Sequence, residues 1–260
     1  MIVDTNVNLS RWPFRRVAGD EPTDLVARLR KHHVVQAWAG SFDGIFHRDI
    51  GGVNARLAED CRRFGAGVLV PFGSVNPKLP DWQEDLRRCH QAHRMPGIRL
   101  HPNYHGYNLA DSVFAELLRL AAARRLIVQL ALCMEDERSQ HPLMRVPPVD
   151  LAPLADVIKG VPGLRLVILN CNPRIDPDQL PPLAAAGEVY FEFSMVEGVG
   201  GVARLAKRVS LERVLFGSNF PLFYVESALL KVQESGLSEG EKDALFEGNA
   251  RRLLPPGASA

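Results

Sequence analysis

Short apolar runs alternate with longer amphipathic stretches along the chain, and this alternation is the feature that most restricts its fold. The apolar runs predict eight strands, at residues 2–6, 34–40, 67–75, 97–100, 126–132, 164–170, 189–193 and 214–217. The helical spacing between them predicts helices at residues 23–31, 53–64, 82–93, 112–123, 151–158, 177–186, 201–207 and 227–234. Eight strand–helix units in 260 residues favour the α/β class and a parallel sheet closed into a TIM (β/α)8 barrel.

The ends of these elements carry recognisable signals. Thr23 and Ser112 are candidate N-caps, and four glycines stand where helix C-caps are expected: Gly65, Gly160, Gly187 and Gly236. Residues 238–245 and 249–254 predict extra C-terminal helices, and the tail at 255–260 is expected to be disordered. Without a repeat or an interdomain linker, residues 1–254 are predicted to form one domain. An open doubly wound sheet is the alternative, but the first strand lacks the glycine-rich turn that often follows in that fold.

Charge and composition restrict the partners. A net charge of +1 gives no electrostatic reason to expect nucleic acid or an anionic membrane. We see no secretory signal, and no apolar stretch approaches the roughly 18 residues of a membrane span. The four cysteines are scattered and form no Cys-x-x-Cys pair, which favours a reducing cytoplasm. We therefore expect a cytoplasmic protein whose partner is a small-molecule ligand. A homo-oligomer is compatible with the sequence, which fixes no oligomeric state.

Polar residues interrupt or end several apolar runs. Asp4, Asn6 and Asn8 alternate along the first strand, so they share one face. Later strands contain or end in further polar residues: Ser74, Asn76, Arg99, His101, Gln129, Asn170, Glu192 and Asn219. Long irregular stretches at 9–22, 42–52, 101–111 and 134–148 follow strands, at the end where barrel enzymes keep their sites. Burying so many polar groups at one mouth costs free energy unless partners satisfy them, which predicts a binding site.

Four segments together resemble the amidohydrolase-related superfamily, in its branch of short metal-dependent hydrolases and decarboxylases. They are IVD at residues 2–4, GIRLHP at 97–102, VLFGSNFP at 214–221 and GNARRLL at 248–254. The resemblance covers nearly the whole chain, and its last two segments are the more specific ones. It implies a TIM barrel and a metal-dependent hydrolase or decarboxylase.

The resemblance also implies metal ligands that this chain has exchanged. The family places His-x-His on the first strand, where this chain has Asn6 and Asn8. It places a histidine late in the fifth strand, where Ala131 stands, and another at the end of the sixth, where Asn170 stands. Its eighth-strand aspartate corresponds to Asn219. Carboxamides do not balance the charge of a divalent cation, and the aspartate would have been the general base. We therefore predict no bound metal and no cofactor.

Three hypotheses follow. In the first, a metal-free pocket binds a small polar or anionic ligand through these residues: Asp4, Asn6, Asn8, Arg99, Asn170 and Asn219. In the second, a metal-independent hydrolase or lyase uses His101 and Glu192 for acid–base catalysis, with Arg99 as an anion clamp. His105 could replace His101 in that role. The third is a metal-dependent hydrolase with rearranged ligands, recruited from Asp4, His101, His105, His141 and Glu192.

Each candidate also has a structural interpretation. His101 would be a barrel-end histidine bonded to the backbone, and Glu192 would pair with Arg99. The aromatic residues 42–47, and Trp12 and Phe14 after the first strand, predict either a mobile loop over the site or ordinary packing.

Overall fold

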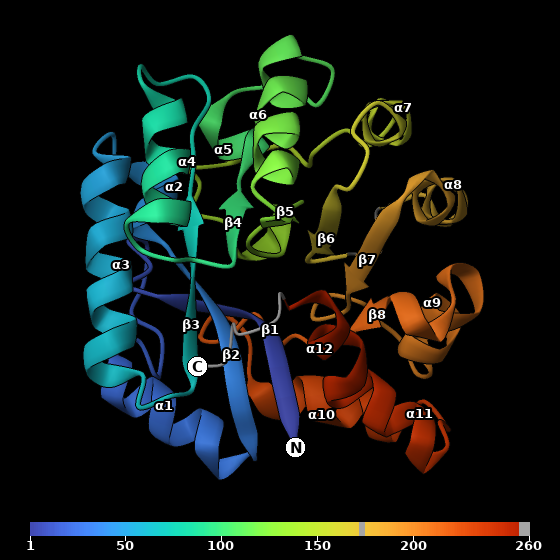
Figure 1. Ribbon diagram of the computed structural model, residues 1–260. Coiled ribbons are helices and arrows are strands. Elements are labelled where there is room, and N and C mark those ends of the chain that lie inside the picture. The colour runs from blue at the N-terminus through green and yellow to red at the C-terminus, as the bar shows by residue number, and fades with distance from the viewer. Residues whose placement is uncertain (172–174, 255–260) are drawn as a thin grey trace.

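A computed structural model of the chain (Figure 1) describes residues 1–171 and 175–254. Eight parallel strands follow one another around the sheet in chain order, so the predicted TIM barrel is confirmed. They are β1 (Ile2–Leu9), β2 (Val34–Ser41), β3 (Leu69–Ser74), β4 (Gly97–Leu100), β5 (Ile127–Ala131), β6 (Arg165–Leu169), β7 (Glu188–Glu192) and β8 (Val214–Leu215).

The barrel closes between its last and first strands. The amide of Thr5 donates to the carbonyl of Phe216 at 2.9 Å, and the amide of Asn8 donates to that of Phe220 at 2.8 Å. A parallel bridge joins Val7 to Phe220. Closure brings β1 beside β8, so residues from the two ends of the chain meet at the same mouth.

Helices surround the strands (Figure 1). They are α1 (Pro22–Lys31), α2 (Asp43–Phe46), α3 (Ile50–Phe64), α4 (Trp82–Gln91), α5 (Pro102–His105), α6 (Ser112–Ala123), α7 (Leu154–Lys159), α8 (Leu180–Ala186), α9 (Gly201–Val209), α10 (Val225–Gln233), α11 (Glu239–Asp243) and α12 (Asn249–Leu253). Single 3-10 turns lie at Glu137–Ser139, Pro177–Gln179 and Leu211–Arg213, and a π-helical turn at Ala244–Gly248 joins α11 to α12. No helix in the described part of the chain is long and apolar enough to cross a membrane. The predicted disordered tail, 255–260, lies outside the described residues.

The helix ends partly match the predicted caps. Gly65, Gly160 and Gly187 are C-caps as predicted. Gly236 is not, because α10 is capped earlier, at Glu234. The two N-cap predictions are wrong. Pro22 starts α1, since proline is pre-organised for the first helical turn, and Thr23 therefore lies inside the helix. Ser112 lies inside α6, whose N-cap is Asp111.

Two short helices, α2 and α5, lie in stretches predicted to be irregular. α2 follows β2 and α5 follows β4 almost at once, so both lie at the C-terminal mouth of the barrel. Below them, the indole of Trp38 stacks on Phe72 with ring centroids 4.9 Å apart. Both rings belong to a buried cluster with Val3, Ile127 and Leu215. The barrel interior is therefore apolar at this level and polar nearer the mouth.

Candidate functional site

The candidate site residues of β1, Asp4, Asn6 and Asn8, are all buried, with at most 1% of each residue exposed. The Asp4 carboxylate accepts hydrogen bonds from the Ser218 hydroxyl at 2.5 Å, the Ser218 amide at 3.1 Å and the Asn6 amide at 3.0 Å. Burial raises the pKa of Asp4 to about 7, because removing water disfavours the charged form more than these donors favour it. Asp4 thus joins β1 to the segment after β8.

The four asparagines at the predicted ligand positions bond within two pairs. Asn6 Nδ2 donates to Asn170 Oδ1 at 2.7 Å, and Asn170 Nδ2 donates to the carbonyl of Cys133. Asn8 Nδ2 donates to Asn219 Oδ1 at 3.1 Å, and Asn219 Nδ2 donates to the carbonyl of Met134 at 3.1 Å. The side chains of Asn8, Asn170 and Asn219 therefore both donate and accept, which a neutral carboxamide is equipped to do, whereas that of Asn6 donates.

Two of these asparagines also have a backbone role. Asn170 follows β6 and has φ of 59°, and Asn219 after β8 has φ of 54°. Asparagine adopts this left-handed region more readily than most residues with a side chain. Local backbone geometry is thus a second reason for asparagine at both positions.

Glu192, at the end of β7, completes the first asparagine pair. Its Oε2 accepts from Asn6 Nδ2 at 3.0 Å, the Asn170 amide at 2.9 Å and the Ser194 hydroxyl at 3.0 Å, and its Oε1 accepts from the Ser194 amide. Complete burial raises the pKa of Glu192, and these donors oppose the shift. No ion pair joins the described side chains of Glu192 and Arg99, so the expected pairing of the two is not a direct contact.

The Arg99 guanidinium is also buried and bonded within the barrel. Its Nε donates to Gln129 Oε1 at 2.8 Å, and its Nη1 donates to Asn8 Oδ1 at 2.7 Å and the Val7 carbonyl at 3.0 Å. Its Nη2 donates to the Trp38 carbonyl at 3.1 Å. Burial lowers the pKa of Arg99 to about 9. Most of its donors are therefore occupied by the protein itself.

A glycine makes room for this guanidinium. A Cβ placed at Gly40 would lie 2.7 Å from Arg99 Nη1, closer than real Cβ contacts come. Any larger residue on β2 at this point would displace the arginine. The pocket for Arg99 is thus built by the first, second, fourth and fifth strands together.

We call Asn6, Asn8, Asn170 and Asn219, with Glu192 and Arg99, the amide network. Its donor set does not fit the divalent metal ion that the family resemblance implies. The Oδ1 atoms of Asn8, Asn170 and Asn219 already accept hydrogen bonds, and the guanidinium on Asn8 puts a fixed cation beside the site. Ala131, at the fifth-strand position, offers no ligand atom. The described residues also contain no group of three or more His, Cys, Asp or Glu side chains able to hold a metal ion.

The β4 side of the mouth has a different character. His101 is buried, and neither of its ring nitrogens has a hydrogen-bond partner in the described structure. The backbone bond expected of a structural His101 is therefore not formed. Burial lowers the pKa of His101 well below its usual value, with smaller contributions from His105 and Arg99. The imidazole is consequently neutral at physiological pH.

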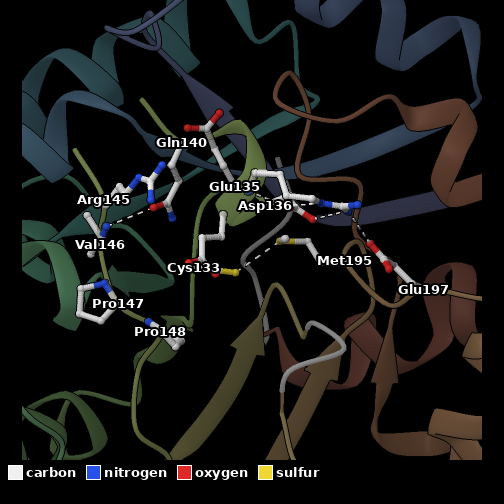
Figure 2. Close-up of a pocket in the computed structure, with 12 residues that line it drawn as sticks. Cys133, Glu135, Asp136, Gln140, Arg145, Val146, Pro147, Pro148, Met195 and Glu197 are labelled. Atoms are coloured by element: carbon white, nitrogen blue, oxygen red, sulfur yellow. Dashed lines mark hydrogen bonds and ion pairs between the residues drawn. The ribbon is translucent and has the colours of Figure 1, made fainter. Parts of the chain in front are cut away.

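A cavity of about 560 Å³ opens between the loops after β5 and β7 (Figure 2). Its wall includes Cys133, Val146, Pro147, Pro148 and Met195 together with charged residues of the same two loops. The sulfur atoms of Cys133 and Met195 are 3.5 Å apart. The Cys133 carbonyl also accepts the hydrogen bond from Asn170 Nδ2. Cys133 thus links the cavity to the amide network, although none of the network's side chains lines the cavity. Neither sulfur residue was predicted as a site residue, since neither belongs to a motif or interrupts a strand pattern.

The aromatic residues after β1 and β2 pack together. The Trp12 ring lies 5.1 Å from that of Phe42 and 5.6 Å from that of Phe46. Phe14 contacts Phe46 at 5.7 Å and stacks on His141 of the β5 loop at 5.5 Å. These contacts match the packing interpretation and join three loops over the mouth.

The closed (β/α)8 barrel with buried polar side chains at the carboxyl ends of its strands defines a TIM-barrel protein with its candidate site at the usual mouth. The amidohydrolase family matches residues 4–255, so the chain belongs to this family. No curated protein matches the sequence.

Solved structures share the fold. 5-Carboxyvanillate decarboxylase from Sphingomonas paucimobilis has a TM-score of 0.72 at 12% identity, over 97% of this chain and 98% of that one. An amidohydrolase from Burkholderia multivorans with bound HEPES has a TM-score of 0.68 at 16% identity, over 98% and 100%. 2,6-Dihydroxybenzoate decarboxylase from Rhizobium has a TM-score of 0.67 at 12% identity, over 96% and 98%. At these identities the likeness concerns the fold alone.

Proposed function

We propose that this amidohydrolase-family protein works without the metal centre of its relatives and binds a small polar or anionic ligand at the barrel mouth. The observation that carries the proposal is the amide network, in which side chains at the metal-ligand positions bond to one another. Asn6 donates to Asn170 and Glu192. Asn8 donates to Asn219 and accepts from Arg99. A metal ion would have to break these bonds before it gained ligands.

The cavity between the β5 and β7 loops supports ligand binding. Its volume of about 560 Å³ lies within the roughly 300–1,000 Å³ typical of small-molecule sites. Apolar groups from Val146, Pro147 and Met195 share its wall with polar and charged side chains, among them two arginines and four carboxylates: Arg138, Arg145, Glu135, Asp136, Glu137 and Glu197. This combination is suited to a ligand with an apolar body and polar groups.

A metal-independent hydrolase or lyase is the second candidate, and the unpartnered imidazole of His101 is the observation that favours it. A neutral imidazole can act as a general base if it reaches the proton to be removed. The other two residues of that hypothesis are less available. Glu192 accepts four hydrogen bonds, and Arg99 donates four to the barrel. Ligand binding is therefore the function that the site supports best.

Metal analysis tests the first part of the proposal. The protein is purified without chelators, incubated with zinc, manganese and iron in turn, desalted and analysed for bound metal. We expect far less than one equivalent of each metal. One equivalent that survives desalting would overturn the metal-free interpretation.

A ligand screen tests the second part. Small carboxylates, lactones and phosphoesters are assayed for thermal stabilisation and for turnover. Stabilisation without turnover supports a binding protein. If the protein shows turnover, and His101→Ala or Glu192→Gln abolishes it while the variant stays folded, the enzyme hypothesis would replace the binding proposal. If no compound in any class stabilised the protein, the ligand-binding proposal would be wrong.

A further inference from the structure

Several buried polar atoms on the β3–β4 side of the mouth have no partner within the described residues. They are both ring nitrogens of His101, Nδ1 of His105, the hydroxyl of Tyr107 and the hydroxyl of Ser74. Ser74 and His101 are each 1% exposed, and Tyr107 is 4% exposed. Leaving such a group buried and unpaired costs roughly 1–3 kcal/mol. The occurrence of several such groups in one part of the barrel therefore requires a physical explanation.

We call Ser74, His101, His105 and Tyr107 the β4 cell: His101 and Tyr107 lie beside His105, and Ser74 is linked to it through Gly44. The His105 ring lies 5.9 Å from that of His101 and 6.5 Å from that of Tyr107, between ring centroids. His105 Nε2 lies 3.0 Å from the carbonyl of Gly44 in α2. Gly44 in turn lies against Ser74, because a Cβ added to it would fall 1.9 Å from the Ser74 hydroxyl oxygen.

The hydrogen-bonding capacity of the cell favours an acceptor-rich ligand. Because Nε2 of His105 faces a carbonyl, it carries the proton, and its Nδ1 is then an acceptor. The hydroxyls of Ser74 and Tyr107 and one nitrogen of a neutral His101 can each donate a hydrogen bond. Three unpaired donors in one cluster match the acceptor oxygen atoms of an oxyanion.

The local charge also favours an anion over a cation. Ser74 is the register partner of Arg99 on the neighbouring strand, and His101 follows Arg99 by two residues. The positive charge of Arg99 contributes to the lowered pKa of His101, so its field reaches the cell. No carboxylate belongs to the cell, and the nearest buried ones act on Arg99 itself: Asp4 is bonded to Ser218 and Glu192 to Asn170. A metal cation would meet repulsion here, whereas an anion would be attracted.

We propose that Ser74, His101 and Tyr107 form a buried subsite for the carboxylate group of the ligand, and that α2 covers it. The inference rests on the proposed function, since it locates one group of the same ligand. It assigns the anion to the β4 cell rather than to Arg99 directly, whose donors are largely occupied.

The cover contacts the cell through Gly44, while Phe46 at its end packs against Trp12 and Tyr104. The bond from His105 to the Gly44 carbonyl fixes α2 above the cell, and the Cα of Gly44 lies close to Ser74 because it lacks a side chain. Gly44→Ala would therefore push α2 away from Ser74. We expect this substitution to speed the hydrogen exchange of α2 amides and to increase the reactivity of His101 toward diethylpyrocarbonate.

Binding measurements test the subsite with formate, acetate and benzoate as probes. Titration calorimetry is run on the wild type and on Ser74→Ala, His101→Gln and Tyr107→Phe, with the exposed Tyr224→Phe as the matched control. We expect each of the three variants to weaken carboxylate binding roughly 10-fold, as the loss of one hydrogen bond to a charged group predicts. The control should leave the affinity unchanged. Near-UV circular dichroism identifies variants that are folded, and the conservative Tyr107→Phe retains the test if the others unfold.

The outcomes separate this inference from the proposed function. Carboxylate affinities that are equal in all folded variants would overturn the subsite while the ligand-binding proposal stands. Failure of every carboxylate to bind the wild type would also overturn it, and would leave the cell as a site for ordered water only. Lactones or phosphoesters that still stabilise the protein would, in that case, keep the proposed function.

Discussion

The two sides of the barrel mouth differ in how their buried polar groups are satisfied. In the amide network, every side chain has a hydrogen-bond partner: Asn8, Asn170 and Asn219 donate and accept, Asn6 donates twice, and Glu192 accepts four bonds. In the β4 cell, the described structure leaves four side chains with unpaired atoms. The first group is thus paired within the protein, whereas the second is not. Burial alone therefore does not identify a binding site; burial without partners does.

Removing the charge at the centre of the mouth should have the largest effect. Arg99→Ala would leave Gln129, Asn8 and the carbonyls of Val7 and Trp38 without their donor. We expect the free energy of unfolding to fall by up to about 5 kcal/mol, measured by urea denaturation. The exposed Arg87→Ala is the control and should leave the denaturation midpoint unchanged. A small effect of Arg99→Ala would mean that the network is not a unit of stability.

The pH dependence of stability should have opposite signs on the two sides. In the folded state Asp4 keeps its proton up to a pKa of about 7, whereas its ordinary pKa is 3.8. Between these values the unfolded state loses the proton first, so the contribution of Asp4 to the free energy of unfolding should fall as pH rises from about 4 to 7. At about 1.4 kcal/mol per pKa unit this contribution falls by roughly 4 kcal/mol. Relative to the wild type, Asp4→Asn should therefore gain about this much stability between pH 4 and 8 in urea denaturation, and a variant with the wild-type pH dependence would contradict the assignment.

The β4 cell should respond in the opposite direction. Burial lowers the pKa of His105 to about 4 from 6.5, so the unfolded state takes up a proton first as the pH falls. The stability should therefore decrease from pH 6.5 to 4, by roughly 3 kcal/mol for this residue. His105→Gln should flatten that decrease, with the exposed His47→Gln as control. If the two variants behaved alike, the acid sensitivity would have another source.

The smallest effect should come from the unpaired hydroxyl of the cell. Ser74→Ala removes a buried oxygen that has no partner in the described structure, so the ligand-free protein should gain about 1 kcal/mol. Saturating benzoate should cancel this gain if the hydroxyl binds the carboxylate. Thermal denaturation with and without benzoate measures both. A loss of stability without benzoate would show that the hydroxyl already has a partner, such as ordered water.

The strands were largely predictable from the sequence. Strand β4 agrees with the predicted 97–100 at both ends, because Pro96 and Pro102 flank a short apolar run. β1 extends beyond the predicted 2–6 to Leu9. Its polar residues suggested an early end, but contacts from across the barrel satisfy Asn8. The local sequence pattern around Asn8 carries no information about a partner that is distant along the chain.

The position of these polar residues was predictable, but their bonding was not. Alternation on β1 and the ends of β6 and β8 placed Asp4, Asn6, Asn8, Asn170 and Asn219 at one mouth, where hydrogen bonds join β1 to the ends of β6 and β8, and their role in ligand binding stays a prediction. Which amide bonds to which depends on barrel closure and side-chain rotamers, which sequence spacing does not specify. Helices α2 and α5 were missed because four residues are too few for a helical period. Because neither helix was predicted, the contact between His105 and Gly44 was not predicted either.

The interlocking of the asparagines also bears on how this sequence can change over evolutionary time. Asn6 supports both Asn170 and Glu192, and Asn8 supports both Asn219 and Arg99. A single substitution of either asparagine by histidine would break two partnerships and still leave one imidazole alone, too few ligands for a metal. Each step toward a metal site would thus begin with a loss of stability. The amide network therefore opposes the stepwise introduction of metal ligands into this chain.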